Sequence, residues 1–209
     1  SKTALAVAHA AMEEDIENYN HIYLGQPRED DDDVIIKRSW VMAAIDAHIK
    51  LGFEPQGQRK VGFDVADSGD DKCANVESHG SVILSADEWK AGEDEILLSC
   101  TKTYDRAMVS QAHIGYDCIG VGATSGAKSS ELNESRRLFI QYSKFNAADA
   151  VWQPEAPYAR AQVKNKDMFA NLKAQSWWLL ADRFRNTYNA IHRGQQFDPS
   201  ELISISSEC

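Results

Sequence analysis

The chain has 209 residues, of which 43% are hydrophobic, and this is enough for the core of one large domain. Its formal net charge is −10, and no apolar run reaches the roughly 20 residues of a membrane span, so we expect no membrane-spanning segment. The four cysteines (Cys73, Cys100, Cys118, Cys209) show no C-x-x-C or other metal-ligand spacing. They are therefore predicted to be free thiols in a reducing cytoplasm.

The charge is distributed unevenly. Residues 1–100 carry 21 acidic and 9 basic side chains, whereas residues 123–193 carry 11 basic and 6 acidic ones. A metal-dependent enzyme that acts on a polyanion needs such a combination, because carboxylates hold the cations and basic side chains hold phosphates. The alternative is an ordinary solvated surface with scattered charge.

The chain begins with helix-forming residues at 3–20, followed by an acidic run at 29–33 that is typical of a solvated linker. Residues 34–51 have apolar side chains at helical spacing, with Asp33 as the N-cap and Gly52 as the stop. This predicts one amphipathic helix. His48 lies on its apolar face and is interpreted as a packing residue rather than a ligand.

Residues 60–71, K-V-G-F-D-V-A-D-S-G-D-D, form a short β-type run that ends in carboxylates. The alternation places Val61, Phe63 and Val65 on one face, and Asp64 on the other. A charge inside a strand is costly unless something binds it, and a metal ion would do so. The alternative is a wet edge strand followed by an acidic turn.

Residues 73–78 and 81–85 then predict a hairpin, so the first three strands are expected to be antiparallel neighbours, with a helix following at 95–113. Residues 114–121, I-G-Y-D-C-I-G-V, are nearly all apolar, as expected of a buried central or parallel strand. Asp117 stands in the middle of this run. Two strand-borne carboxylates, Asp64 and Asp117, can therefore converge on one site, and oxygen ligands favour Mg²⁺ or Mn²⁺ over Zn²⁺.

Residues 120–129, G-V-G-A-T-S-G-A-K-S, do not have the spacing of a phosphate-binding loop, so no nucleotide site is expected in this segment. They are interpreted as a flexible loop that leads into a short helix at 129–135. A strand is predicted at 136–146, an irregular segment at 147–158 and a long helix at 166–192 that stops at Gly194. The aromatic residues of this helix are predicted to pack in the core.

The tail F-D-P-S-E-L at 197–202 has two interpretations. Asp198 and Glu201 have the spacing of a helix-capping box, and either is also a candidate for a third metal-binding carboxylate. Spacing alone does not choose between them. Together these elements predict an α/β protein of RNase H-like (ribonuclease H/retroviral-integrase-like) architecture, a mixed sheet flanked by helices. Sites of that kind hold two divalent cations about 3.5–4 Å apart and hydrolyse phosphodiesters by in-line attack.

An ordered set of motifs resembles the C-terminal nuclease domain of the large terminase subunit of headful-packaging tailed bacteriophages of the podovirus type. The motifs are H-I-Y-L-G-Q-P-R, D-D-D-V-I-I-K-R-S-W, V-G-F-D-V-A-D-S-G-D-D-K, Y-D-C-I-G-V-G-A, K-A-Q-S-W-W and F-D-P-S-E-L-I-S-I, spread over residues 21–205. The resemblance implies part of an ATP-driven packaging motor. Its nuclease domain is expected to cut concatemeric double-stranded DNA when packaging starts and when the capsid is full.

The resemblance also implies roles for individual residues. Asp64 and Asp117 match the first two metal ligands of the family, and Asp198 best matches the third. Glu201 and Asp182 are rivals for the third position, and Asp71 matches a supporting acid. Basic residues of the 123–193 region are expected to contact DNA, namely Lys128, Arg136, Arg137 and Lys173.

The implied organisation is a linker or helical tail at residues 1–33, which would follow an N-terminal ATPase domain, and a nuclease domain at 34–209. Expected partners are double-stranded DNA, the ATPase domain of the same polypeptide, the portal and the small terminase subunit, in the cytoplasm of the host cell and without a membrane. Two alternatives share part of this pattern. One is a structure-selective resolvase or RNase H on the same fold, and the other is a non-catalytic module that docks on the portal.

Overall fold

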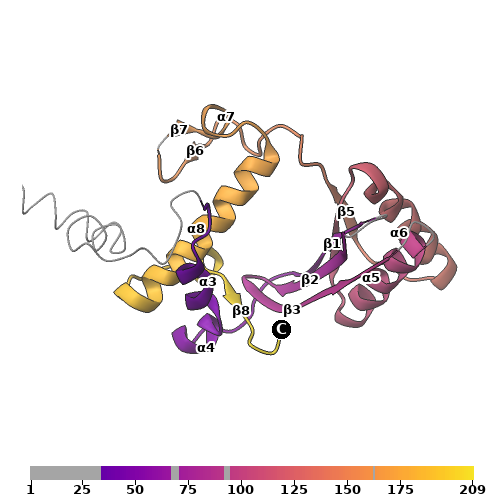
Figure 1. Ribbon diagram of the computed structural model, residues 1–209, viewed down its shortest axis with the longest axis horizontal. Helices are drawn as coiled ribbons and strands as arrows, with labels where there is room; N and C mark the ends of the chain where they lie inside the picture. The colour runs from indigo at the N-terminus through magenta and orange to yellow at the C-terminus, as the bar shows by residue number, and fades with distance from the viewer. Residues whose placement is uncertain (1–33, 67–70, 92–94, 162) are drawn as a thin grey trace, which may run out of the picture.

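A computed structural model describes residues 34–66, 71–91, 95–161 and 163–209, and the backbone alone at Val121 (Figure 1). Several predictions therefore lie outside the described residues: the helix at 3–20, the acidic run at 29–33 with the N-cap Asp33, and the acids Asp67 and Asp70. Within the described ranges, no helix is long and apolar enough to cross a membrane. The four cysteines are free, as predicted.

The centre of the fold is a six-stranded mixed sheet with the order β5-β4-β1-β2-β3-β8. Its strands are β1 (Arg59–Asp64), β2 (Cys73–His79), β3 (Val82–Trp89), β4 (His113–Asp117), β5 (Tyr142–Phe145) and β8 (Ser204–Ile205). Strands β1, β2 and β3 are antiparallel neighbours, which confirms the prediction. Strand β4 runs parallel to β1, β5 parallel to β4, and β8 parallel to β3.

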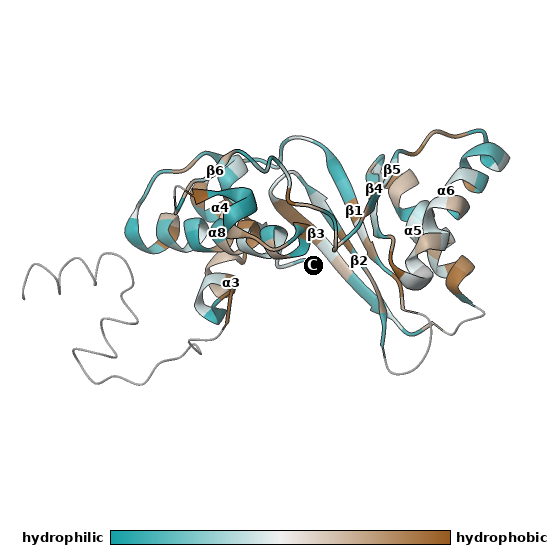
Figure 2. Ribbon diagram, turned by 90° about the horizontal axis from the view of Figure 1, so that it is seen from above, coloured by the Kyte–Doolittle hydropathy of each residue, from teal (hydrophilic) through white to brown (hydrophobic). Residues whose placement is uncertain are grey.

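Helices lie on both sides of the sheet (Figure 2). One layer holds α5 (Ile96–Ser110) and α6 (Ala123–Arg136), and the other holds α3 (Arg38–Ala44), α4 (Ala47–Leu51) and α8 (Leu172–Arg193). The alternation of β1 decides which side chains meet the first layer. Val61 and Phe63 are buried among residues of α5 and β4, whereas Gly62 and Asp64 are exposed on the other face.

A β-bulge in β3 lets an apolar side chain of the sheet pack on the second helix layer. Glu77 pairs with Ser85 but Ser78 pairs with Ile83, so Leu84 is an extra residue on β3. Ser85 bonds to Arg106 of α5, whereas Ile83 packs on Phe184 and Ile203 in the α8 layer. The bulge therefore moves an apolar side chain to the opposite face, where α8 is anchored at the hairpin end of the sheet.

The predicted single helix at 34–51 is wrong in its continuity, because an isolated β-bridge at Ile45 interrupts it. Ile45 pairs in parallel with Ile205 of β8, and the Asp46 N–H donates to the Ile205 carbonyl at 2.8 Å. The backbone of Asp46 takes the left-handed conformation, with φ of 52°. Gly52 ends α4 as predicted. His48 contacts Ser204 Oγ through Nδ1 at 2.8 Å, which fits its interpretation as a packing residue.

Other elements differ from their predicted bounds. Residues 120–129 are not a loop, since they form a 3₁₀ turn, η2 (Gly120–Gly122), and the start of α6. The predicted strand at 136–146 is reduced to β5. The predicted helix at 166–192 is split into α7 (Asn165–Met168) and α8. The backbone of Phe169 is extended, which ends α7, and the Asn171 side chain caps α8 by accepting a hydrogen bond from the Ala174 N–H. The irregular segment before it leads into a hairpin of β6 (Pro157–Tyr158) and β7 (Val163–Lys164).

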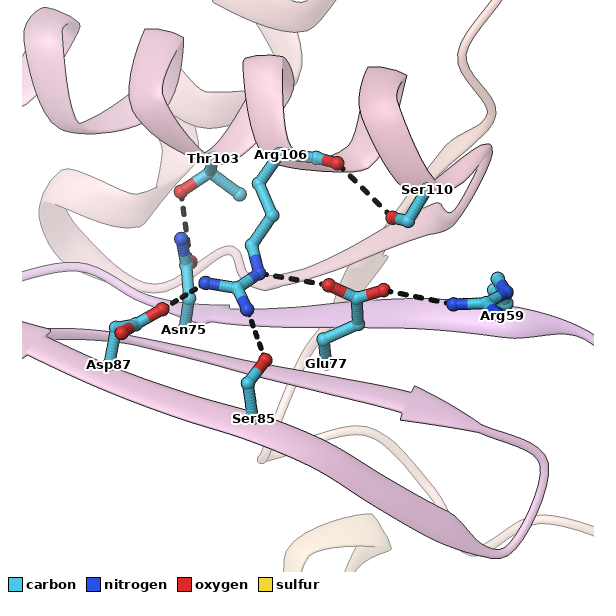
Figure 3. Close-up of polar contacts among 8 residues, drawn as sticks. All are labelled: Arg59, Asn75, Glu77, Ser85, Asp87, Thr103, Arg106 and Ser110. Carbon is cyan, nitrogen blue, oxygen red and sulfur yellow. Dashed lines mark hydrogen bonds and ion pairs between the residues drawn. The ribbon is translucent and has the colours of Figure 1, made fainter. Parts of the chain in front are cut away.

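An ion-pair network fastens α5 to the hairpin (Figure 3). Glu77, only 8% exposed, accepts from Arg106 Nε at 3.0 Å and from Arg59 at 3.4 Å. Arg106 also bonds to Asp87 and Ser85, so its guanidinium spans both strands of the hairpin. Arg106 is therefore the centre of this network.

We expect Arg106→Met to lower the unfolding free energy by about 2–3 kcal/mol, because it removes one of two cations from a buried carboxylate. Urea unfolding of the variant measures this loss. The double variant Arg106→Met/Glu77→Leu should recover part of it, since no unpaired carboxylate then stays buried. A single variant as stable as the wild type would show that the network contributes nothing to stability.

Candidate functional site

Asp64 and Asp117 are the last residues of two neighbouring parallel strands, β1 and β4. The register pairs Phe63 with Tyr116, so the next residues along each strand are Asp64 and Asp117. Parallel strands lie about 4.8 Å apart, and residues in register point to the same face. Phe63 and Tyr116 are buried under the α5 layer, so both aspartates project from the opposite face. The structure thus brings these two predicted residues together.

The environment of each aspartate differs from its prediction. Asp64 is exposed and Asp117 is half-buried, and Asp117 ends its strand rather than standing in the middle of it. The expected cost of a charge buried within a strand therefore does not arise. What distinguishes the pair is the closeness of two like charges at one edge of the sheet, an arrangement that a cation stabilises.

The turn after β4 fixes Asp117. Its Oδ1 accepts a hydrogen bond from the Ile119 N–H at 3.0 Å, a local bond that ends the strand. A Cβ on Gly122 would lie 1.9 Å from the Asp117 carbonyl oxygen, and one on Gly126 would lie 2.2 Å from the Tyr116 hydroxyl. Both positions therefore require glycine for close packing of η2 and α6 on β4. This explains the glycine-rich stretch without a bound phosphate.

The donor set of the pair fits a hard divalent cation, because carboxylate oxygens are the preferred ligands of Mg²⁺ and Mn²⁺. The pair is not a complete site by itself. Among the residues that the structure describes, no three His, Cys, Asp or Glu side chains lie together closely enough to hold a metal ion. Within the described part of the chain, no third His, Cys, Asp or Glu therefore completes a metal site with Asp64 and Asp117.

Asp198 forms a helix cap at some distance from the pair. Its Oδ1 accepts from the Ser200 N–H at 2.8 Å, and Glu201 accepts from the Asp198 N–H at 3.2 Å, so the capping-box interpretation is confirmed. The Ser200 hydroxyl and N–H hold the pKa of Asp198 below its usual value. Asp198 lines a cavity of about 380 Å³ together with Lys60. Lys60 precedes Asp64 by four residues of extended strand, or roughly 13 Å.

Asp182 is held by a different set of partners. It accepts from the Tyr158 hydroxyl at 2.5 Å, from Arg160 at 3.2 Å, and forms an ion pair with Arg185 at 3.3 Å. Burial, and then this hydrogen bond, raise the pKa of Tyr158. Asp182 and Glu201 both line a second cavity, of about 520 Å³. The two cavities share Arg183 and Ser200 in their linings and so adjoin.

Asp71 is exposed just before β2, and Ala74 of β2 pairs with Asp64. It therefore lies at the same end of the sheet as the aspartate pair, as expected of a supporting acid. The structure brings none of the three candidates Asp182, Asp198 and Glu201 to that end of the sheet. All three border the two cavities along α8 and the turn η3 (Pro199–Glu201).

Three of the basic residues expected to contact DNA lie on α6 or at its end, in the layer that covers the opposite face of the sheet from the aspartates. Lys128 pairs with Glu131 at 2.8 Å, and Arg136 pairs with Asp105 and lies over the Tyr104 ring. Arg137 directly follows the last turn of α6. A helix of 14 residues is about 21 Å long, so Arg137 lies about that far from Ala123, the first residue of α6. Lys173 is in the first turn of α8 and exposed.

Two basic residues on the aspartate side, Lys60 and Arg183, were not named individually from the sequence, although Arg183 belongs to the basic region at 123–193. Both line the 380 Å³ cavity. Lys60 has the same parity as Asp64 on β1, and this places it on the same face of the sheet. That parity was available from the sequence. The position of Arg183 depends on how α8 packs and had no local indication.

Comparison with known proteins found no matching family model and no matching curated protein. Solved structures do match. A variant nuclease domain of the large terminase subunit gp2 of bacterial virus Sf6, determined with manganese and β-thujaplicinol, is 32% identical with a TM-score of 0.77. The match covers 84% of this chain and 74% of that one. The nuclease domain of the same subunit, and a variant determined with calcium, each match at 32% identity with a TM-score of 0.76 over the same shares.

Proposed function

Since the chain belongs to the nuclease domains of bacteriophage large terminase subunits, we propose that it is an endonuclease that cuts double-stranded DNA during viral genome packaging. Its fold is RNase H-like, as predicted, and its role is that of a metal-dependent nuclease domain. Cutting of concatemeric DNA at packaging initiation and at headful termination is part of the proposal. The proposal also includes a preference for DNA over other polyphosphates as the substrate.

The observation that carries the proposal is the side-by-side placement of Asp64 and Asp117 on parallel strands. Related domains were determined with manganese and with calcium, which are both cations that carboxylates bind. We propose that this pair binds Mg²⁺ or Mn²⁺, with two ions in the active state. Such ions, when bound, activate water and stabilise the leaving oxygen during phosphodiester hydrolysis.

The chain's own residues contribute position and charge. The bond from the Ile119 N–H fixes one oxygen of Asp117 and leaves the other free to bind a ligand. Gly122 keeps the chain close behind Asp117, so the carboxylate is held on a rigid turn between β4 and α6. A fixed carboxylate orients a cation and the phosphate that approaches it, which is the geometric part of catalysis.

We propose that the third carboxylate comes from the C-terminal segment, with Asp198 first and with Asp182 and Glu201 as the alternatives. Each lines one of the two adjoining cavities, and the 380 Å³ cavity is also lined by Lys60, which is on the same face of β1 as Asp64. Asp71 is proposed as a supporting acid because it lies at the same end of the sheet.

Manganese titration by calorimetry identifies the third ligand. Single variants Asp198→Asn, Asp182→Asn and Glu201→Gln are compared with the wild type, and Asp198→Asn is expected to weaken binding by at least about tenfold. If Asp182→Asn or Glu201→Gln weakens binding while Asp198→Asn does not, that residue takes the position instead. Asp105→Asn, on the opposite helix layer, is the matched control and should bind as the wild type does.

A substrate comparison tests the proposed reaction. The domain is incubated with Mn²⁺ or Mg²⁺ and with supercoiled plasmid, an RNA–DNA hybrid or a four-way junction. The proposal expects cutting of the plasmid and its loss when a chelator removes the metal. A strong preference for hybrid or junction would favour the RNase H or resolvase alternative. Absence of metal binding would favour a non-catalytic docking module.

In the packaging machinery, we propose that the nuclease domain works with an N-terminal ATPase domain of the same polypeptide, and that residues 1–33 are the linker between the two domains. The portal and the small terminase subunit are proposed as further partners, in the cytoplasm of the infected host cell. Support for these partners comes from family membership alone. Co-purification of the full-length subunit with a portal from the same virus is the experiment that tests the docking partner.

A further inference from the structure

We infer that DNA is held by a line of four basic side chains, Lys60, Arg183, Arg185 and Arg160, called here the basic track. It leads from the aspartate pair on the sheet to the outer end of the α8 layer. The inference rests on the proposed function, because it identifies how that site holds its substrate. Arg160, Arg183 and Arg185 belong to the basic region at 123–193, but none of the four was among the residues named individually as DNA contacts.

The track begins on β1. Lys60 and Asp64 are four residues apart on one strand and so project from the same face. Lys60 is exposed and forms no ion pair with any residue in the described ranges. With the cut phosphate at the aspartate pair, a separation of roughly 13 Å corresponds to about four base pairs of duplex length. Lys60 is therefore placed to hold a phosphate a few nucleotides from the cut.

The 380 Å³ cavity joins Lys60 to Arg183 of α8. Arg183 is exposed, and its hydrogen bond to the Leu202 carbonyl oxygen is long, at 3.5 Å. Glu54 and Asp198 line the same cavity, but Asp198 is turned toward Ser200. The two cations are thus available to a ligand that bridges the cavity.

The 520 Å³ cavity extends the track from Arg183 to Arg185 and Arg160. In this cavity, Asp182 forms ion pairs with Arg160 and Arg185, and the Glu201 carboxylate accepts a hydrogen bond from the Asp198 N–H. The wall of this cavity is built by two buried amides, Asn165 and Gln175, which both donate to the Trp152 carbonyl. It is therefore a recess lined by three arginines and two carboxylates, of which Asp182 pairs with Arg160 and Arg185.

The chemistry of the track matches a nucleic-acid backbone. Arginine presents a planar set of donors that binds phosphate oxygens in pairs, and lysine adds a point charge. Lys128 and Arg136 of α6 are paired with acids, as Arg160 and Arg185 are with Asp182, but the layer that holds α6 lies across the sheet from the aspartates. Hence the DNA is expected on the α8 side.

Binding of a short fluorescent duplex, measured by anisotropy with a chelator present so that no cutting occurs, tests the track. Lys60→Gln, Arg183→Gln and Arg160→Gln should each weaken binding about fivefold and reduce the slope of log affinity against log salt by about 0.9 per lost phosphate contact. Arg137→Gln, at the end of α6, is the matched control and should bind as the wild type does. Thermal unfolding confirms that each variant is folded.

The outcomes separate this inference from the nuclease proposal. Binding that is unchanged in the track variants, or weakened equally by Arg137→Gln, overturns the track even if the domain cuts plasmid. A wild-type domain that binds no duplex at low salt also overturns it. Conversely, track-dependent binding without any metal-dependent cutting supports the track and counts against the nuclease.

Discussion

Asp64→Asn and Asp117→Asn are each expected to reduce plasmid cutting at least about 100-fold. Loss of the hydrogen-bonding partners around metal ligands already costs about 10- to 100-fold, and loss of a ligand itself should cost more. Asparagine preserves the shape of the side chain while removing the negative charge. Both aspartates end their strands on the open face of the sheet, so neither change is expected to disturb the core.

Initial rates of plasmid nicking in Mn²⁺ give the measurement. Asp105→Asn is the matched control, since this acid lies on α5 and pairs with Arg136 on the far side of the sheet. The two site variants should also unfold at the wild-type temperature. A variant that folds normally and cuts within tenfold of the wild type would remove that aspartate from the site.

The second large effect is expected at Gly122, where a Cβ would lie 1.9 Å from the carbonyl oxygen of Asp117. The contacting atom is backbone, so relief requires η2 to move away from the end of β4. We expect Gly122→Ala to lower the unfolding free energy by about 3 kcal/mol, in the range typical of overpacking. For a domain of this size that corresponds to a melting temperature lower by about 6–12 °C.

The same change should reduce activity beyond the loss of folded protein, because it displaces the residue that bears the second carboxylate. Cutting is therefore measured well below the melting temperature and scaled to the folded fraction. Gly115→Ala is the control for stability, since a Cβ at Gly115 of the same strand meets nothing within 4 Å. Equal stability of the two variants would contradict the packing explanation for Gly122.

Local patterns predicted a large part of this structure. The alternation of apolar residues in β1 identified its buried face, and the hairpin of β2 and β3 followed from neighbouring strand patterns. The convergence of Asp64 and Asp117 was also predictable, because strands that each end in an aspartate place both at one edge when they are parallel neighbours. Gly52 and Gly194 ended their helices as expected.

Non-local packing decided the features that the sequence patterns missed. The break between α3 and α4 arises because Ile45 pairs with Ile205, a residue 160 positions later in the chain. The early start of α6 depends on how closely Gly122 and Gly126 approach β4. Helical periodicity describes neither interaction, since it considers only residues within a few positions of one another.

The sequence alone also did not predict on which side of the sheet the basic residues lie. Charge counts identified residues 123–193 as basic, but α6 and α8 from that region lie on opposite sides of the sheet (Figure 2). Only the face that bears the aspartates is relevant to the substrate. The same limit applies to the third carboxylate, because its position depends on the packing of α8 and η3 against the sheet.

The central claim is that Asp64 and Asp117 together hold the catalytic metal. The most direct test is a crystal structure of the domain soaked in Mn²⁺, with manganese located by its anomalous scattering. We expect a manganese peak between these two carboxylates and its loss in Asp64→Asn crystals. Manganese bound elsewhere, with both carboxylates free of metal and the peak unchanged in the variant, would contradict it.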